Sequence, residues 1–274
     1  MEHMDDIYSA IVKARASGRL AALCTVIRAR GSVPRHTNSK MLVLDDGRFV
    51  GTIGGGEMES RVIAVARQIL QGDEPRIEHY ELIDPKQGDP GVCGGEVDIF
   101  IEPIKPDPVV LVIGGGHVGK AIVHLAKWLG FRVALADDRP EFCTPEWAPG
   151  ADEYLPGPLA DLPRRFNFHA ETYIVMPTRG MNIDVDALPH LIEAPHAYLG
   201  VIGSRRRWST AVKVLNERGI PEDIIQRIHA PMGLELNAET PEEIAVSIMS
   251  EIIMLRRGGT GEPMKQLLKQ PDSS

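Results

Sequence analysis

The sequence predicts an α/β protein with two parts, an N-terminal mixed α/β domain and a Rossmann-like domain with a mainly parallel sheet. An apolar run over 109–113 leads into a glycine-rich turn, and strand and helix patterns then alternate toward the C-terminus. A proline-rich segment over 102–108 separates this half from an N-terminal half in which several strand patterns surround one helix pattern. We therefore predict domains over 1–103 and 109–258, followed by a loose tail over 259–274.

The turn after the apolar run has the glycine spacing of a dinucleotide-binding fold. Gly114, Gly116 and Gly119 fit the pattern G-x-G-x-x-G. The first glycine permits a tight turn, the second lets a phosphate approach the backbone, and the third lets the next helix pack close to the strand. Apolar residues at helical spacing predict that helix over 118–129.

The next strand pattern supports the same prediction. A strand is predicted over 132–136, and Asp137 follows it, 18 residues beyond Gly119. An acidic residue at this place holds a ribose hydroxyl in dinucleotide-binding folds. We expect an exposed Asp137 carboxylate whose removal weakens nucleotide binding and leaves the fold intact. His117, inside the turn, either faces a phosphate or caps the helix. A Rossmann-like scaffold with an empty crevice is the alternative.

Further elements of the second half follow from periodicity and capping. Strands are predicted over 172–176 and 198–202. A long helix begins with a capping box, in which Thr240 is the N-cap and Glu243 is its partner, and it ends at Gly258.

The N-terminal half reads as strands around a single helix. Strands are predicted over 20–30, 41–44, 49–53, 76–83 and 97–101, and a helix over 58–70. The two short strands form a hairpin that turns at Asp46-Gly47. Three prolines in 102–108 cannot continue a strand ladder or a helix, so this segment is predicted to be an extended linker.

Composition excludes several classes of protein. A net charge of −8 and a pI of about 5.6 argue against nucleic acid as the main partner. No apolar run is long enough to span a membrane, and no signal peptide is visible. The three cysteines, Cys24, Cys93 and Cys143, are odd in number and unevenly spaced, which suits a reducing compartment. We expect a cytoplasmic protein.

Two glycine-rich loops of the N-terminal half are candidate binding sites. Gly54, Gly55 and Gly56 open the predicted helix, and backbone N–H groups at a helix start bind anions. The second loop places Cys93 before Gly94 and Gly95, which leaves the thiol open to a ligand. Together they suggest an anionic ligand with a soft atom near the thiol. The alternative is two tight turns around a small buried residue.

Motifs in both halves resemble the XdhC/CoxI family of molybdenum-hydroxylase accessory proteins. They lie at 31–35, 40–41, 51–59, 93–95, 114–119, 137–142, 200–205, 231–234 and 240–245. The resemblance implies a protein that binds the molybdenum cofactor (molybdopterin), protects it, and helps deliver its sulfurated form to a xanthine dehydrogenase-like molybdenum hydroxylase apoenzyme. It also implies a cysteine desulfurase as sulfur donor.

The cofactor's chemistry gives roles to residues of these motifs. The helix start at Gly55 could take its phosphate, and Arg35 could bind the same phosphate through two hydrogen bonds, or form only a surface ion pair. Cys93 could contact the metal or accept a persulfide sulfur. Glu59 either binds pterin nitrogens or stabilises the helix start.

Three positions depart from the family pattern. Asn38 stands where glycine is frequent, 178–180 reads Thr-Arg-Gly in place of Thr-His-Asp, and 236–238 reads Leu-Asn-Ala in place of Ile-Gly-Ala. The first change predicts a differently shaped loop. The other two lie beside the predicted crevice and leave its ligand open.

Two functions compete at this point. One is a non-catalytic cofactor chaperone, which we expect to be a homo-oligomer; the other is an NAD(P)-dependent oxidoreductase. The second needs a proton donor at the crevice, and no Lys/Tyr or His/Asp pair at a recognisable spacing supplies one, so no catalytic residue is assigned. Gly203, Ser204 and Arg205 lie at the carboxyl end of a predicted strand and are further candidate binding residues.

Overall fold

A computed structural model describes residues 2–33, 35–72, 74–82 and 94–267. The chain divides into two compact units, unit 1 (Met1–Asp107) and unit 2 (Pro108–Ser274). Each unit has a five-stranded sheet of its own. The predicted class, a mixed α/β part followed by a Rossmann-like part with a parallel sheet, is confirmed.

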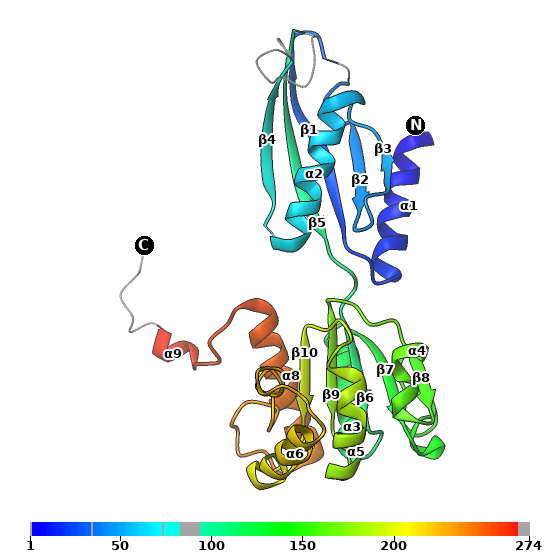
Figure 1. The fold of residues 1–274 in the computed structure, drawn as a ribbon, viewed down its shortest axis with the longest axis vertical. Helices are drawn as coiled ribbons and strands as arrows, with labels where there is room; N and C mark the ends of the chain where they lie inside the picture. Colours follow the sequence, from blue (N-terminus) through cyan, green and yellow to red (C-terminus); the bar gives the residue numbers. More distant parts are fainter. Residues whose placement is uncertain (1, 34, 73, 83–93, 268–274) are drawn as a thin grey trace. The chain divides into compact units, whose positions relative to one another are not determined.

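Unit 1 is an antiparallel sheet with two helices (Figure 1). Its elements are α1 (Glu2–Ala16), β1 (Ala21–Arg30), β2 (Lys40–Leu44), β3 (Phe49–Gly51), α2 (Gly56–Gly72), β4 (Arg76–Glu81) and β5 (Glu96–Ile104). The strand order is β3-β2-β1-β5-β4, with antiparallel pairing throughout. The predicted hairpin is formed by β2 and β3.

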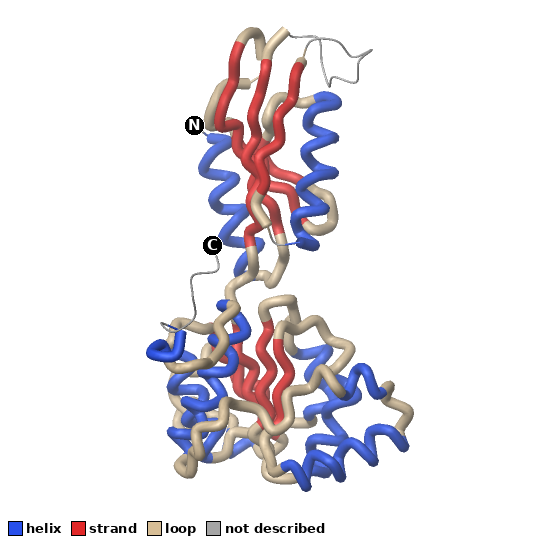
Figure 2. The backbone as a smooth tube through the Cα atoms, turned by 90° about the vertical axis from the view of Figure 1, so that its left-hand side faces the viewer, coloured by secondary structure: helices blue, strands red, loops and turns tan. Residues whose placement is uncertain are grey.

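The central strand, β1, is covered on both faces. Ala22 and Val26 are buried in the core under α2, whereas Leu23 packs in a second cluster with Ile7 of α1. Figure 2 shows the two helices on opposite sides of this sheet. Burial on both faces explains why β1 begins with four consecutive apolar residues. The helix α1 is not among the predicted elements.

The segment 102–108 is not wholly a linker, contrary to the prediction. Strand β5 runs through Pro103, which pairs with Ala22 of β1. On the other side β4 begins with Arg76 opposite Ile101, so Pro103 has a neighbouring strand on one side only. A proline, which lacks an N–H, is tolerated at a position of this kind.

Unit 2 is built on a parallel sheet with the order β10-β9-β6-β7-β8. Its strands are β6 (Val109–Ile113), β7 (Arg132–Asp137), β8 (Glu153–Pro156), β9 (Thr172–Met176) and β10 (Tyr198–Val201). Its helices are α3 (His117–Trp128), α4 (Leu162–Arg165), α5 (Met181–Leu191), α6 (Arg205–Glu217), α7 (Glu222–Ile225), α8 (Pro241–Arg257) and α9 (Met264–Leu267), with short 3₁₀ turns η2 (Pro140–Phe142) and η3 (Leu159–Asp161).

Helices cover both faces of this sheet, as Figure 2 shows. Residues of α3 and α8 form one core, which includes Ile122 and Ile248, and residues of α5 and α6 form the other, which includes Leu188 and Leu215. All five residues of β6 are buried, as the apolar run predicts. No helix within the described ranges is long and apolar enough to cross a membrane.

The ends of α8 match the sequence prediction. The Thr240 side chain accepts a hydrogen bond from the Glu243 backbone, and the Glu243 carboxylate accepts one from the Thr240 backbone, which completes the capping box. Gly258 ends the helix in a left-handed conformation with φ +68°. The predicted loose tail contains the short helix α9.

Candidate functional site

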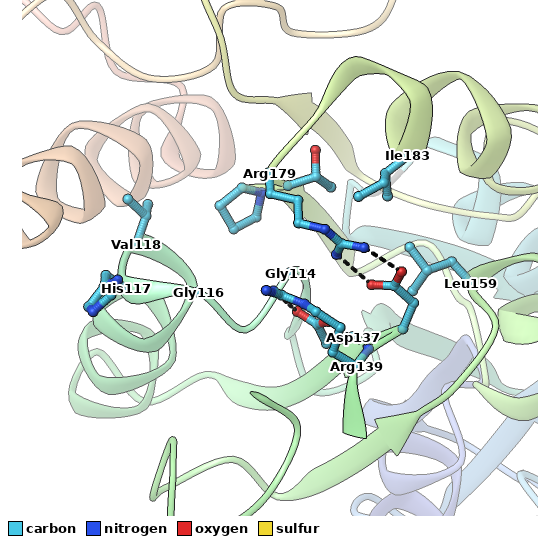
Figure 3. A pocket seen from close by; sticks show the side chains of 12 residues that line it. Gly114, Gly116, His117, Val118, Asp137, Arg139, Leu159, Arg179 and Ile183 are labelled. Atoms are coloured by element: carbon cyan, nitrogen blue, oxygen red, sulfur yellow. Dashed lines mark hydrogen bonds and ion pairs between the residues drawn. The ribbon is translucent and has the colours of Figure 1, made fainter. Parts of the chain in front are cut away.

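A crevice opens in unit 2 where β6, β7 and β9 end, with a volume of about 240 Å³ (Figure 3). The order of the sheet reverses between β6 and β9, and open α/β sheets bind ligands at such a switch point. The lining residues are Gly114, Gly116, His117, Val118, Asp137, Asp138, Arg139, Leu159, Pro177, Thr178, Arg179 and Ile183.

The glycine turn has the geometry that its spacing predicts. A Cβ at Gly119 would lie 1.9 Å from the Gly114 carbonyl oxygen, so only glycine lets α3 pack this close to β6. A Cβ at Gly116 would meet no atom within 4 Å, and no side chain caps the start of α3 there. The turn is therefore tight on its inner side and open toward the crevice.

Asp137 is buried, with an exposed fraction of 1%, so the prediction of an exposed carboxylate is wrong. Its Oδ2 accepts hydrogen bonds from the Gly115 N–H (2.7 Å) and from Arg139 Nη2 (3.0 Å). Its Oδ1 accepts from the Arg139 backbone N–H (2.9 Å) and Nε (3.0 Å). A carboxylate offers about four acceptor positions, so Asp137 has none left for a ribose hydroxyl. It ties the glycine turn to the end of β7.

Arg179, which follows β9, pairs with Asp138, which follows β7. Nη1 and Nη2 donate to the two carboxylate oxygens, each at 2.7 Å. This guanidinium lowers the pKa of Asp138 to about 2, and the carboxylate raises the pKa of Arg179. Because β6 lies between β9 and β7, the pair spans the strand end at which the glycine turn begins. Figure 3 shows the Arg179 side chain reaching toward the β7 side, with Leu159 and Ile183 nearby.

Asp138 and Arg139 belong to the family motif at 137–142 but are not predicted as site residues. Arg179 is predicted to lie beside the crevice, at the carboxyl end of a strand, and to depart from the family pattern, but no role is assigned to it. The available signal is that Asp138 and Arg139 directly follow Asp137 at a strand's carboxyl end. The Arg139 guanidinium also stacks on the Phe142 ring, 3.9 Å from its centre.

The predicted group at 203–205 does not line the crevice. Ser204 instead caps α6 by accepting a hydrogen bond from the Arg207 backbone, and Arg205 is exposed. Arg207 forms an ion pair with Asp184, which also accepts a hydrogen bond from Thr178. Burial raises the pKa of Asp184, against the opposing effect of these two hydrogen bonds. This cluster holds α5 and α6 to the end of β9.

The predicted binding segments of unit 1 leave its sheet toward one end, from different positions along β1. The pair Arg30–Glu96 places the end of β1 beside the start of β5. The pair Thr25–Lys40 places the start of β2 beside the middle of β1, five residues before that end. The Thr52 N–H donates to the Lys40 carbonyl oxygen (3.1 Å), which brings the end of β3 to the same place. The loops that contain Arg35, Gly54 to Gly56, and Gly94 with Gly95 therefore leave the sheet toward the same end, although the segment that leads to Gly54 starts beside the middle of β1.

Two of these loops are in close contact. A Cβ at Gly95 would lie 2.5 Å from the carbonyl oxygens of Arg30 and Ser32, so only glycine permits this approach. Gly94 has φ +76° and open space where a Cβ would stand. Arg35 is exposed. Cys93, the predicted thiol ligand, lies outside the described residues.

The helix start of α2 already binds a carboxylate of the chain. Glu59 Oε2 accepts hydrogen bonds from Thr52 Oγ1 (2.7 Å), the Ile53 N–H (3.2 Å) and the Gly55 N–H (3.1 Å). The Gly54 N–H donates to Thr52 Oγ1 (3.2 Å). Of the two roles predicted for Glu59, stabilising the helix start is therefore the one seen. An external phosphate would have to compete with the Glu59 carboxylate for the hydrogen bond from the Gly55 N–H.

At two of the three departures from the family pattern, an asparagine adopts the positive φ that is usual for glycine. Asn38 has φ +74° and Asn237 has φ +52°. Among non-glycine residues, asparagine tolerates this left-handed region best. The loop at Asn38 thus adopts a glycine-like conformation, which argues against the predicted change of shape.

The other two cysteines have structural positions. Cys24 is buried in the core of unit 1, and burial raises the pKa of its thiol to about 12. Cys143 is buried in unit 2, where its thiol donates to the Leu135 carbonyl oxygen. A thiol with a raised pKa is a poor nucleophile at neutral pH.

Known proteins share both units. The model of the XdhC Rossmann domain matches residues 110–252, and the model of the XdhC and CoxI family matches residues 14–81. The uncharacterized protein YqeB of Escherichia coli is 37% identical over 244 residues, which cover 88% of this chain and 44% of YqeB. A probable xanthine dehydrogenase subunit from Bacillus subtilis is 31% identical over 58% of this chain and 46% of its own length. The chain thus spans less than half of each of these two relatives.

Two further relatives match most of this chain and most of their own length. The molybdenum cofactor insertion chaperone PaoD of Escherichia coli is 22% identical over 89% of this chain and 86% of its own length. A solved structure described as a xanthine dehydrogenase from Bacillus halodurans has a TM-score of 0.50 at 21% identity, covering 98% of this chain and 97% of that one, and shares the fold. The resemblance drawn from the motifs is confirmed, and the chain belongs to the XdhC and CoxI family.

Proposed function

We propose that this protein binds the molybdenum cofactor, protects it, and helps deliver its sulfurated form to a xanthine dehydrogenase-like molybdenum hydroxylase. The main support is that the loops of Arg35, Gly54 to Gly56 and Gly94 leave the unit 1 sheet toward the same end, with the Arg35 loop in contact with Gly94 and Gly95. Membership in the family and the name of its relative PaoD support the same role. A cysteine desulfurase is the proposed sulfur donor, and we expect the protein to form homo-oligomers.

The residues at this end suit the chemistry of the cofactor. Arg35 is exposed and can bind a phosphate through two hydrogen bonds. The backbone at Gly94 is open on the side where a Cβ would stand, and the residue before it is Cys93, a soft ligand and sulfur acceptor. When bound, the cofactor would supply the metal and the dithiolene; the protein would hold it and shield it from water.

Activation of a molybdenum hydroxylase apoenzyme tests this proposal. Cys93→Ser replaces a thiolate by a hydroxyl of similar size, and we expect activation to fail although the protein folds. Arg35→Ala should weaken cofactor binding by about 1.5–3 kcal/mol. Cys143→Ser and Arg48→Ala are matched controls, because Cys143 is a buried structural thiol and Arg48 an exposed arginine on the β2–β3 hairpin. If the Cys93→Ser variant activates the apoenzyme fully, the Cys93 thiol has no role in activation.

An NAD(P)-dependent oxidoreductase is the second candidate, favoured by the crevice at the switch point of unit 2. A pterin in the purified protein favours the chaperone, and turnover of a nicotinamide nucleotide with an organic substrate favours the oxidoreductase.

A further inference from the structure

A second cavity of unit 2 lies at the amino end of β10, and we call it the edge pocket. Its volume is about 410 Å³, which falls within the range of small-molecule sites. Its walls come from residues within 192–199 and 224–229. The crevice lies instead at the carboxyl ends of β6, β7 and β9, and within the described part of the chain the two spaces share no lining residue. The edge pocket is therefore a separate site.

The edge pocket is lined by basic side chains. Arg227, His196 and His229 line it, and none of its described lining residues is acidic, although the whole chain has a net charge of −8. The Arg227 side chain is 74% exposed, and its ion pair with Asp223 is long, at 3.7 Å. Because exposed ion pairs contribute little to stability, this guanidinium can turn to a ligand at little cost. The lining therefore favours an anion.

Backbone and side-chain contacts both hold His229 in place. Its N–H donates to the Leu199 carbonyl oxygen, and its carbonyl oxygen accepts from the Val201 N–H, each at 2.9 Å, so His229 extends the sheet beside β10. Its ring stacks on the Tyr198 ring, with the two centres 4.6 Å apart. Its Nδ1 lies 3.0 Å from Glu251 Oε1. The imidazole is thus oriented before any ligand binds.

The Glu251 carboxylate determines which nitrogen of His229 remains for a ligand. Glu251 Oε2 accepts hydrogen bonds from the Tyr198 hydroxyl and the Gly233 N–H, each at 2.6 Å. Burial opposes the charge on this carboxylate, but the hydrogen bonds from His229, Tyr198 and Gly233 outweigh it and lower its pKa. An ionised carboxylate only accepts hydrogen bonds, so His229 Nδ1 carries the hydrogen and Nε2 remains. The same carboxylate stabilises the imidazolium that forms when Nε2 takes up a proton.

His196 is oriented in a similar way. Its Nδ1 lies 2.7 Å from the Ala194 carbonyl oxygen, which only accepts, so Nε2 remains for a ligand here as well. When protonated, both imidazoles donate from Nε2 and carry a positive charge. A metal ion is less suitable, because among the described residues no group of three or more His, Cys, Asp or Glu side chains could hold one.

The remaining side chains of the lining include four large apolar ones: Ile192, Leu199, Ile224 and Ile228. A cavity of about 150 Å³ admits a benzene ring, so the edge pocket has room for a ring and a charged group. We propose that the edge pocket binds a small organic anion, a carboxylate or phosphate on a compact apolar body. Arg227, His196 and His229 bind the anion, and the apolar side chains contact the body. The proposal concerns unit 2 alone and does not rest on the cofactor-binding role of unit 1.

Calorimetric titration of the full chain with two pairs of probes tests both parts of this ligand. Benzoate is compared with benzamide, its neutral analogue, and phenyl phosphate is compared with inorganic phosphate, which has no ring. We expect the wild type to bind each ringed anion about tenfold or more tightly than the other member of its pair. Benzamide lacks the charge that the basic groups bind, and inorganic phosphate lacks the apolar contact. The ringed anion that binds more tightly identifies the acid group that the pocket prefers.

Two variants and two matched controls place the anion in the edge pocket. Arg227→Gln and His196→Gln should each weaken binding of the preferred ringed anion about tenfold or more, because each removes a charged hydrogen-bond donor. Arg206→Gln and His190→Gln should bind it as the wild type does, since both residues are exposed and lie outside the lining.

Three results would overturn the proposal. The first is that neither ringed anion binds at millimolar concentration or has an advantage over the other member of its pair. The second is that the Arg227 or the His196 variant binds the preferred anion as tightly as the wild type. The third is that Arg179→Ala abolishes binding, which would place the anion in the crevice.

Discussion

Replacing Asp137 by alanine should destabilise unit 2 although the residue stands at the mouth of a predicted ligand site. The change leaves the buried Gly115 N–H without its acceptor, which costs about 1–3 kcal/mol. It also removes the anion that holds Arg139, whose side chain is 29% exposed and can be rehydrated in part. We therefore expect a loss of about 2–4 kcal/mol. For a unit of this size, that lowers Tm by about 4–16 °C.

Tryptophan fluorescence isolates this effect, because Trp128, Trp147 and Trp208 are the three tryptophans of the chain and all lie in unit 2. Trp147 donates its indole N–H to the Gly115 carbonyl oxygen and thus reports on the turn itself. Asp138→Ala is the control, since it removes an exposed ion pair and should cost less than about 1 kcal/mol. If Asp137→Ala unfolds within about 0.5 kcal/mol of the wild type, the anchoring role of Asp137 is refuted.

Three further predictions concern the other described features. Glu59→Ala should speed hydrogen exchange of the Ile53 and Gly55 amides and cost about 1–3 kcal/mol, because both N–H groups lose their acceptor; unchanged protection would contradict this. Asn38→Gly should change the urea midpoint little, whereas Asn38→Val should lower the free energy of unfolding by about 1–2 kcal/mol and the midpoint with it, since the φ of +74° at this position disfavours a branched side chain; equal midpoints would argue against strain. Arg179 lowers the pKa of Asp138 to about 2, so the pair's stabilisation is complete above the unfolded pKa of about 3.9 and is lost as pH falls toward 2. The difference in urea midpoint between wild type and Asp138→Asn should thus be constant from pH 5 to 8 and shrink below pH 4.

Local patterns predict most of the fold. The apolar run before Gly114 and the glycine spacing after it predict the β6–α3 junction, because each depends on residues close in sequence. The capping box at Thr240 is equally local. The position of Pro103 within strand β5 could not be predicted. A proline is tolerated there only because β4 begins opposite Ile101, and this depends on the register of the sheet.

The site is less predictable than the fold for the same reason. Asp137 is recognisable as the acidic residue at the end of the strand. Whether its carboxylate can still accept a hydrogen bond from a ligand depends on a backbone N–H 22 residues earlier and on the rotamer of Arg139. The Arg179–Asp138 pair joins residues 41 apart whose meeting depends on the strand order. In the sequence, this place is marked by the departure at Arg179 and by the position of Asp138 directly after Asp137 at a strand end.

The most direct test of the proposed function is the pterin content of the protein after anaerobic purification from cells that make the molybdenum cofactor. Oxidation of the bound cofactor gives a fluorescent pterin, and metal analysis measures molybdenum in the same sample. We predict that the wild type carries both and that Cys93→Ser and Arg35→Ala retain less, with unchanged circular dichroism. A wild-type protein free of pterin and molybdenum, or variants that retain both in full, would contradict cofactor binding at this end of unit 1.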